Sequence, residues 1–351
     1  MKKLLVVLLV LVFATPAMAA EWNFYGSARA GFWYTQYDED ASGVDDSNGD
    51  AESDTDLNYF IQGNSRIGAK VKTSDIIGGR FEYGAFSLRL LYGTAKLGAA
   101  TLVGGVDYSP IDTLYSNQVS DTDNGLLNEG MVYEGRVGQA KLLIGGFQVA
   151  LVTPSVSGVA NDTDVLIPKI ELAYDMKTDA FTVGGFLGFQ TYDWGDSDVS
   201  ESNTSFVLGG RGKFNFGPAY VNFCVAYAQN PTDYGIGMRN TYATSQNTTG
   251  ADVEDAAAIM GALAVGAKLG PSLAIEGGVG YMTSTVTDGA TDDDHTGDAM
   301  TYYIQLPVTL AKGFFIVPEI SIYDFGENDD GNTTTDNGQR VDFGAKIQIN
   351  F

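Results

Sequence analysis

The chain contains one histidine and one cysteine, so few side chains are available for acid–base or covalent chemistry. His295 lies in the stretch DDDHTGD, where an aspartate beside the imidazole would give the arrangement of a general base. A hydrolase would also need that imidazole within reach of a serine or aspartate. We expect His295 instead to be a solvated side chain at a loop tip. The sequence therefore predicts a protein that is not an enzyme, with no catalytic residues and no cofactor.

The same acidic stretch has the offsets of the first positions of an EF-hand calcium loop, at Asp292, Asp294 and Gly297. Thr296 stands at the fifth position, and Tyr303 falls where a closing glutamate is required. We therefore expect no specific metal site.

Cys224 excludes an internal disulfide because it has no partner cysteine. It lies among the alternating residues Val221, Phe223 and Val225, which indicates a small side chain on a strand rather than a reactive thiol.

Alternation of apolar and polar residues is the dominant pattern of the chain, and it is typical of β-strands. It predicts sixteen strands, near residues 22–37, 57–73, 79–84, 86–95, 100–108, 139–145, 147–155, 167–177, 181–194, 204–216, 219–230, 258–269, 272–286, 299–311, 314–326 and 340–351.

The connections between these strands are alternately short and long. Short turns such as GP at 217–218 and KG at 312–313 alternate with long acidic segments such as ENDDGNTTTDNGQ. A closed barrel in a membrane has short turns at one end and long loops at the other, whereas a soluble sandwich has no reason to sort its loops in this way. The pattern thus favours a 16-stranded antiparallel transmembrane β-barrel.

Charged residues fall on the opposite strand face from the apolar residues. Arg89, for example, lies opposite Phe86, Leu88 and Leu90. The other residues that follow this rule include Arg29, Arg66, Lys70, Lys72, Lys169, Glu171, Asp175, Arg211, Lys213, Glu276, Glu319, Asp342 and Lys346. An Arg or Lys that faces lipid at the bilayer midplane costs about 2–4 kcal/mol, so we expect lipid outside and water inside this barrel.

The last strand keeps its alternation to the terminal residue, Phe351. Backbone polar groups in hydrocarbon must all be paired, so the sheet has to close on itself. We therefore expect the final strand to pair with the first and to end among interfacial aromatic residues.

Residues 1–19 have the layout of a secretory signal peptide. Lys2 and Lys3 precede an apolar run, which is followed by Pro16 and the small-residue box AMA at 17–19. We expect the mature barrel to comprise residues 20–351. Loss of the two lysines changes the formal net charge from −24 to −26, which argues against nucleic acid as a partner.

Three stretches resemble the trimeric general porins of Gram-negative outer membranes. They are NSRIGAKVKT after an acidic first loop, LRLLYGTAKLGAATLVGG before a long third loop, and the terminal AKIQINF. The resemblance implies a location in the outer membrane, a third loop folded into the lumen, homotrimers, and recognition of Phe351 by the barrel-assembly machinery. It also implies contact with outer-membrane lipid and lipopolysaccharide, to which divalent ions at the acidic loops could form bridges.

In that family, acids on the third loop face basic residues on the barrel wall across the pore. The matching basic residues here, which we call the basic ladder, are Arg29, Arg66, Arg80, Arg89 and Lys346. The matching loop acids are Asp112, Asp121, Asp123, Glu129 and Glu134, within residues 109–139. The resemblance implies a field between the two sets that orients polar solutes.

These features predict a channel for the passive diffusion of small hydrophilic solutes and ions. The two charge sets are nearly balanced, so the acidic external loops favour a mild preference for cations. Two alternatives remain open. Inward-facing Tyr25, Trp33 and Phe60 would suit a sugar-specific channel, and long loops would suit a surface adhesin.

Overall fold

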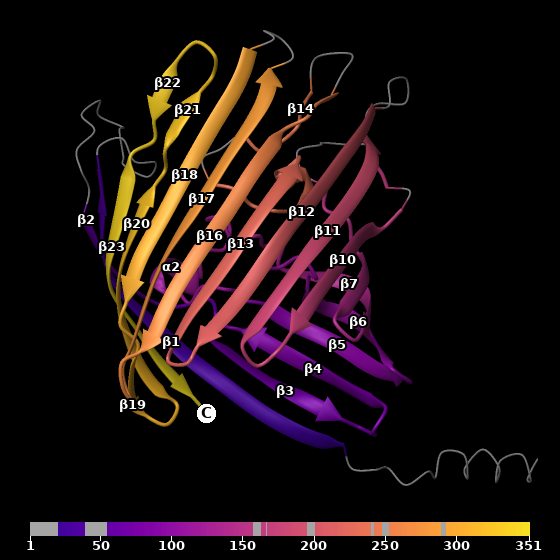
Figure 1. The fold of residues 1–351 in the computed structure, drawn as a ribbon, viewed down its shortest axis with the longest axis vertical. Coiled ribbons are helices and arrows are strands. Elements are labelled where there is room, and N and C mark those ends of the chain that lie inside the picture. The colour runs from indigo at the N-terminus through magenta and orange to yellow at the C-terminus, as the bar shows by residue number, and fades with distance from the viewer. Residues whose placement is uncertain are drawn as a thin grey trace, which may run out of the picture.

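The computed structural model describes residues 20–38, 55–156, 163–165, 167–194, 201–239, 242–247, 253–288 and 293–351, and leaves the side chain of Asp121 undescribed. These residues form a closed antiparallel barrel of sixteen strands, as predicted (Figure 1). Some strands are divided by short interruptions, so the elements outnumber the crossings. The predicted signal peptide at 1–19 lies outside the described residues.

The long and short segments of the barrel run in chain order around it. They are β1 (Glu21–Tyr37), β2 (Thr55–Ile61), β3 (Arg66–Lys72), β4 (Ile77–Gly84), β5 (Leu88–Leu97), β6 (Ala100–Tyr108), β7 (Arg136–Ile144), β8 (Phe147–Val152), β9 (Thr163–Asp164), β10 (Lys169–Lys177), β11 (Phe181–Trp194), β12 (Glu201–Phe216), β13 (Ala219–Gln229), β16 (Ala257–Lys268), β17 (Ala274–Asp288), β18 (Asp293–Gln305), β19 (Val308–Ala311), β20 (Phe314–Asp324), β21 (Glu327–Asp329), β22 (Thr334–Asp336) and β23 (Gln339–Asn350). The remaining elements are not part of the barrel sheet: the helices α2 (Ser120–Asp123) and α3 (Pro231–Tyr234), and the small hairpin of β14 (Gln246–Asn247) and β15 (Val253–Glu254).

Pairing of β23 with β1 closes the barrel, which confirms the expected pairing of the final strand with the first. The two strands pair in register from Ser27 with Asn350 to Tyr37 with Arg340. The pairing continues to the terminal residue, because Gly26 N donates to Phe351 O at 2.7 Å and Phe351 N donates to Gly26 O at 3.0 Å. A Cβ atom at position 26 would lie 2.3 Å from the Phe351 ring, so glycine makes room for that ring.

The outer surface of the barrel is apolar and the charged strand residues point inward, as predicted. On β10, Ile170, Leu172 and Tyr174 are exposed on the outside, whereas Lys169 and Glu171 are buried on the inside. The alternation follows from the period of two of a β-strand. No helix in the described part of the chain is long and apolar enough to cross a membrane.

The prediction that Leu90 faces outward is wrong. The pairing of β4 with β5 shifts register between Glu82 and Tyr83, which is a β-bulge. A bulge adds one residue to one strand and so changes which face the following side chains occupy. As a result Arg89 and Leu90 are both buried, while Leu91 is 55% exposed.

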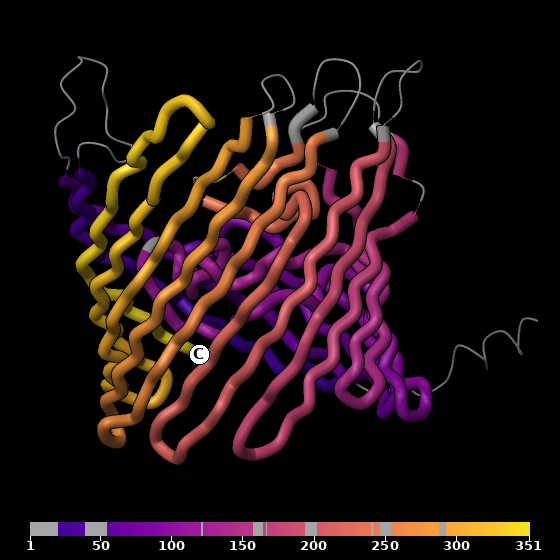
Figure 2. Tube along the Cα trace, turned by 45° about the horizontal axis from the view of Figure 1, so that its top comes forward, coloured from indigo at the N-terminus to yellow at the C-terminus, as the bar shows by residue number. Residues whose placement is uncertain are grey.

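Two external loops fold into the barrel, and they fill the side of the lumen next to β10–β18. They are residues 109–135, called L3 here, and residues 230–239, which follow β13 (Figure 2). Leu126, Met131 and Val132 of L3 pack with Tyr234 and Ile236 against the inner wall. The side of this wall that they cover is apolar, with Cys224, Ala226, Ala228, Ala258, Met260, Ala262, Met282 and Ala299. The expectation of a polar, water-lined inner face is therefore wrong on this side, because loop side chains take the place of water.

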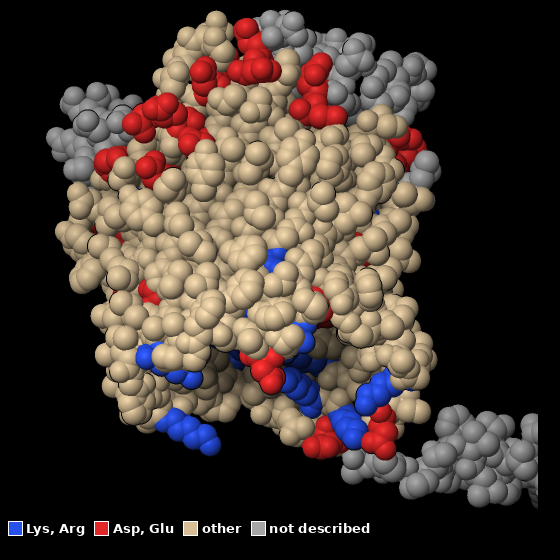
Figure 3. Space-filling view, in the orientation of Figure 1, with Lys and Arg blue, Asp and Glu red and all other residues tan. Residues whose placement is uncertain are grey.

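Charge is distributed unevenly along the barrel axis. Acidic side chains gather at the end that carries the long loops, and basic side chains gather at the opposite end (Figure 3). His295 lies near the acidic end, in β18 rather than at a loop tip, where it pairs with Val286 and contacts the ring of Tyr242. The expected loop-tip position of His295 is thus wrong, because β17 and β18 extend beyond the predicted strands.

A basic residue on the outer wall should be tolerated only near the barrel ends. Leu263 is 41% exposed at the middle of β16, and Leu310 is 53% exposed near the turn at 312–313. We expect Leu263→Arg to lower the free energy of unfolding by about 2–4 kcal/mol and Leu310→Arg to lower it by about 0–1 kcal/mol. Denaturant unfolding in lipid vesicles measures both values, and equal costs at the two positions would contradict a bilayer around this face.

Candidate functional site

L3 runs along the inner wall of the barrel from β10 to β23 and β1. It leaves β6 at Ser109, whose hydroxyl donates to Glu171 Oε2 on β10 at 2.6 Å. Asn117 N donates to Glu276 Oε1 on β17 at 2.8 Å. Val119 N and Ser120 N each donate to the carboxylate of Glu319 on β20 at 2.7 Å. Buried wall carboxylates therefore supply the acceptors that the backbone of an inserted loop requires.

Asp123 forms the tip of L3 and makes contact with the basic ladder. Its carboxylate pairs with the Arg29 guanidinium of β1 and, at 2.8 Å, with Lys346 Nζ of β23. Asn64 Nδ2, beside the interruption between β2 and β3, donates to Asp123 O at 3.1 Å. Asp123 has a left-handed backbone with φ of 69°, a conformation that costs a non-glycine residue about 1–2 kcal/mol. The two ion pairs offset that cost, and they fix the loop tip against the seam where the barrel closes.

The other three arginines of the basic ladder contact a wall acid, not an acid of L3. Arg66 and Arg89 reach Glu82 Oε1 at 3.4 Å and 2.7 Å, and Arg80 reaches Glu82 Oε2 at 2.9 Å. Tyr25 Oη also donates to Glu82 Oε2 at 2.8 Å. One fully buried carboxylate thus holds three guanidinium groups, and the cluster has an excess of positive charge.

The remaining predicted loop acids hold L3 itself. Asp112 Oδ1 accepts the backbone N–H groups of Glu134 and Gly135 at 2.8 Å and 3.0 Å, which closes the neck of the loop. Glu134 Oε1 lies 2.5 Å from Lys169 Nζ on β10. Burial raises the pKa of the Asp112 carboxyl well above its usual range, because the surrounding loop excludes water. Asp121 belongs to α2, but its side chain is not among the described residues.

Glu129 accepts one hydrogen bond from the loop after β13 and one from the barrel wall. Arg239 Nε, on the loop after β13, donates to Glu129 Oε1 at 2.5 Å. Thr301 Oγ1 on β18 donates to Glu129 Oε2 at 2.8 Å. Burial raises the pKa of the Glu129 carboxyl, and the Arg239 charge opposes that rise.

A polar opening remains between L3 and the wall formed by β3–β7. It is a cavity of about 280 Å³, lined by Arg89, Asp123, Tyr133 and Arg136 among others. Arg136, the first residue of β7, has its guanidinium over the Tyr108 ring at 5.8 Å. Within the described part of the chain, no acidic group pairs with Arg136. This basic group is therefore available to a solute in the opening.

The structure thus brings Arg29 and Lys346 together with Asp123, and it separates the rest of the two predicted charge sets. The sequence prediction did not include Glu82, although Glu82 is two residues from Arg80 and so lies on the same, inward face of the strand. It also missed Arg136, which was counted within the third loop although it begins a strand. That these groups line the pore stays a prediction.

The aromatic residues considered for a sugar-specific channel do not form an open row. Trp33 is 2% exposed and packs with Val119, Val317 and Phe60, while Tyr25 is bound into the Glu82 cluster. Among the described residues, no group of three or more His, Cys, Asp or Glu side chains could hold a metal ion.

The chain resembles known proteins in structure rather than in sequence. No protein-family model matches it, and no curated protein sequence matches it. The outer membrane channel DcaP of Acinetobacter baumannii superimposes with a TM-score of 0.67 at 16% identity, over 95% of this chain and 97% of that one. OmpT of Vibrio cholerae, an outer membrane protein, superimposes with a TM-score of 0.62 at 15% identity, over 95% and 98% of the two chains.

The anion-selective porin from Comamonas acidovorans superimposes with a TM-score of 0.54 at 13% identity, over 95% of this chain and 100% of that one. These neighbours share the barrel from end to end. The chain therefore has the fold of the outer-membrane porins, which confirms the fold that the resemblance implied.

Loss of the Glu82 charge should make the lumen more positive. We expect Glu82→Gln to leave Arg66, Arg80 and Arg89 without a carboxylate. A unit charge acts on an ion about 4 Å away by about 1 kcal/mol in water, which is about a fivefold effect, and it acts with opposite sign on cations and anions. The cation-to-anion permeability ratio should therefore fall by at least about fivefold. Reversal potentials across a salt gradient measure this ratio.

Asp75→Asn is the matched control, because it removes one carboxylate from an exposed turn outside the lumen. An equal shift in the two variants would show that Glu82 does not act on permeating ions.

Proposed function

We propose that the protein is a water-filled channel for the passive diffusion of small hydrophilic solutes and ions. The observation that carries the proposal is the arrangement of L3. Wall carboxylates and the ion pairs of Asp123 hold this loop against one side of the barrel, and a polar opening lined by Arg89 and Arg136 remains beside it. A loop fixed in this way narrows a barrel without closing it.

The ion preference depends on two opposed sets of charges. Most basic residues of the inner wall have an acidic partner, such as Lys141 with Asp107 and Arg211 with Asp175. The acidic end of the barrel attracts cations, whereas the Glu82 cluster and Arg136 attract anions. Charges act over about 8 Å at physiological salt. Since pairing leaves the inner wall close to neutral, we propose that the acidic end gives a mild cation preference.

The proposed location is the outer membrane, reached after export by the predicted signal peptide. The apolar outer wall supports insertion in a bilayer. Phe351 pairs with Gly26 in the closed barrel. Before this pairing forms, the end of the final strand would be free to bind the barrel-assembly machinery. The acidic loop end supports contact with lipopolysaccharide through divalent ions.

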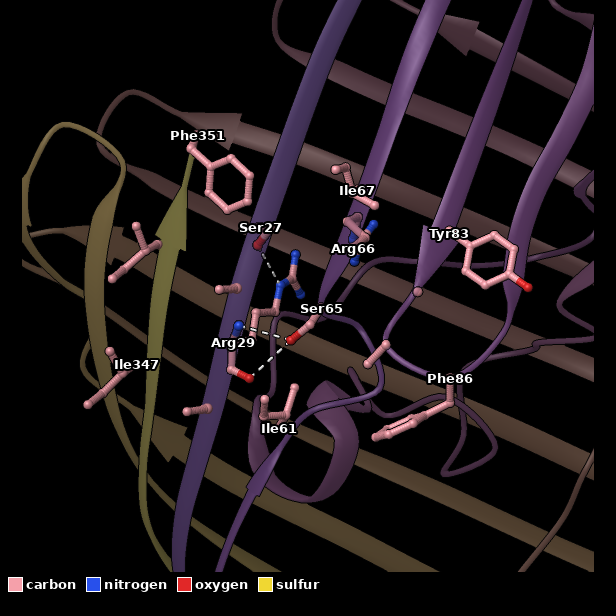
Figure 4. A pocket seen from close by; sticks show the side chains of 15 residues that line it. Ser27, Arg29, Ile61, Ser65, Arg66, Ile67, Tyr83, Phe86, Ile347 and Phe351 are labelled. Carbon is pink, nitrogen blue, oxygen red and sulfur yellow. Dashed lines mark hydrogen bonds between the residues drawn. The ribbon is translucent and has the colours of Figure 1, made fainter.

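We propose that the barrel forms a homotrimer through the wall of β1–β5. An apolar groove of about 520 Å³ lies on the outside of this wall, between Ile67, Tyr83, Phe86 and Phe351 (Figure 4). The barrel wall is shorter here than the thickness of a bilayer, because β4 has 8 residues and a strand needs about 9–11 to cross a bilayer. A neighbouring copy would cover the backbone at the end of the β4–β5 hairpin, which lipid cannot satisfy. OmpT, one of the structural neighbours, has been described in a trimer form.

Channel activity is tested by reconstituting the purified mature chain into planar bilayers. We expect stepwise conductance and a reversal potential of the sign that marks a mild cation preference. Block of the current by sugars would instead indicate a specific channel. Absence of conductance steps would leave the barrel as a scaffold for a surface adhesin.

The trimer is tested by light scattering of the detergent-extracted protein. We expect a particle of three chains, and we expect Phe86→Arg to dissociate it, because an arginine in the apolar groove would be buried without a partner. Asp75→Asn, outside the groove, should leave the trimer intact. A monomeric wild-type particle would contradict the proposed interface.

A further inference from the structure

A second segment holds L3 inside the barrel, and it is called the inner strap here. It consists of residues 231–239, which follow β13 and include α3. The side chains of Tyr234 and Ile236 are completely buried and pack against Leu126, Met131 and Val132 of L3. The return limb of L3 therefore packs both against the inner wall of β13–β18 and against the strap.

The first end of the inner strap is bound to the wall of β10–β12. Tyr234 Oη donates to Glu171 Oε1 at 2.9 Å, and Lys169 Nζ donates to Tyr234 O at 2.5 Å. Gln190 Nε2 donates to Asp233 O at 3.1 Å. One of these strands, β10, also holds the neck of L3, since Glu171 also binds Ser109 and Lys169 also binds Glu134.

The second end of the inner strap is bound to L3 through Arg239. The Arg239 guanidinium pairs with Glu129 and lies 5.6 Å from the ring centroids of both Tyr323 and Phe325. Glu129 is 2% exposed, and its other oxygen is bound to Thr301. A buried carboxylate that loses its cation is strongly destabilised, so Arg239 keeps Glu129 in its place.

The wall under this contact has no room for movement of L3 toward it. A Cβ atom at Gly280 would lie 1.6 Å from Glu129 O, and one at Gly130 would lie 2.3 Å from Gly261 O. The backbone of L3 is thus already in contact with β16 and β17. The contacts of Arg239 and Tyr234 with L3 and with the wall beside it give L3 a second attachment there.

We propose that residues 231–239 are a retaining strap that keeps L3 in its conducting position, and that Arg239 is the positioning residue that fastens the strap to L3. The proposal rests on the proposed channel function. It makes the loop after β13 a determinant of open-channel stability, whereas the width of the opening is set by L3 and the wall of β1–β7.

The test compares Arg239→Ala with Arg239→Lys in planar bilayers and in hydrogen exchange. Loss of the cation beside a buried carboxylate shifts an equilibrium by more than a factor of ten, so Arg239→Ala should increase the time spent in flickering substates by roughly tenfold. It should also speed amide exchange in residues 126–134. Arg239→Lys should restore much of both properties, because the charge is kept.

A deletion removes the strap altogether. Gln229 and Ala257 are register partners on β13 and β16, so an Asn-Gly turn in place of residues 230–256 should close the hairpin. Glu327 and Asp336 are partners on β21 and β22, and replacement of residues 328–335 in the same way gives a control that shortens an exposed hairpin. We expect flickering and rapid exchange in the first variant only.

Wild-type noise and wild-type exchange in Arg239→Ala would overturn the retaining role, as would equal behaviour of the two shortened hairpins. If the wild-type protein does not conduct, the proposed function fails. The exchange measurement then still decides whether the strap holds L3.

Discussion

Complete pairing of backbone polar groups is the constraint on which the structure depends. A strand bordered by hydrocarbon has no water to bind its free N–H and C=O groups, so every strand needs two neighbours. The pairing of β23 with β1 satisfies this condition up to Phe351. Even the interruption between β2 and β3 is bridged, because the Ser65 hydroxyl accepts from Arg29 N at 2.9 Å and donates to Arg29 O at 3.0 Å.

A closed barrel of sixteen strands encloses more space than its wall side chains can fill, and the loops decide how that space is used. L3 and the inner strap occupy the side next to β10–β18 and form an apolar core there. The wall of β1–β7 keeps its charged residues and faces the remaining opening. The lumen is therefore divided into a packed half and a polar half, and the barrel serves both as a scaffold for the loops and as one wall of the opening.

Charge pairing connects these two halves. Wall carboxylates such as Glu276 and Glu319 accept hydrogen bonds from the backbone of L3. In the opposite sense, the carboxylate of Asp123 on L3 pairs with Arg29 and Lys346 of the wall. Among the described residues, each buried charged side chain has an ion-pair or hydrogen-bond partner, because an unpaired buried charge would cost several kcal/mol. The same pairs that hold L3 also neutralise most of the charge on the inner wall, and a local excess of positive charge remains at Glu82 and at Arg136.

The amino-acid sequence by itself determined the strands, their order and, except beyond the bulge at β5, the side of each strand that faces lipid, because period-two alternation is a local property and lipid tolerates few charges. It also contained a sign of the packed half, since AAAIMGALAVGAK at 256–268 is apolar on both faces. Only the tertiary structure decided which charges meet. Asp123 and Lys346 are 223 residues apart, and the partner of Arg239 depends on the path of two loops. Leu90 was misplaced for the same reason, since a bulge depends on the neighbouring strand and alternation within one strand cannot reveal it.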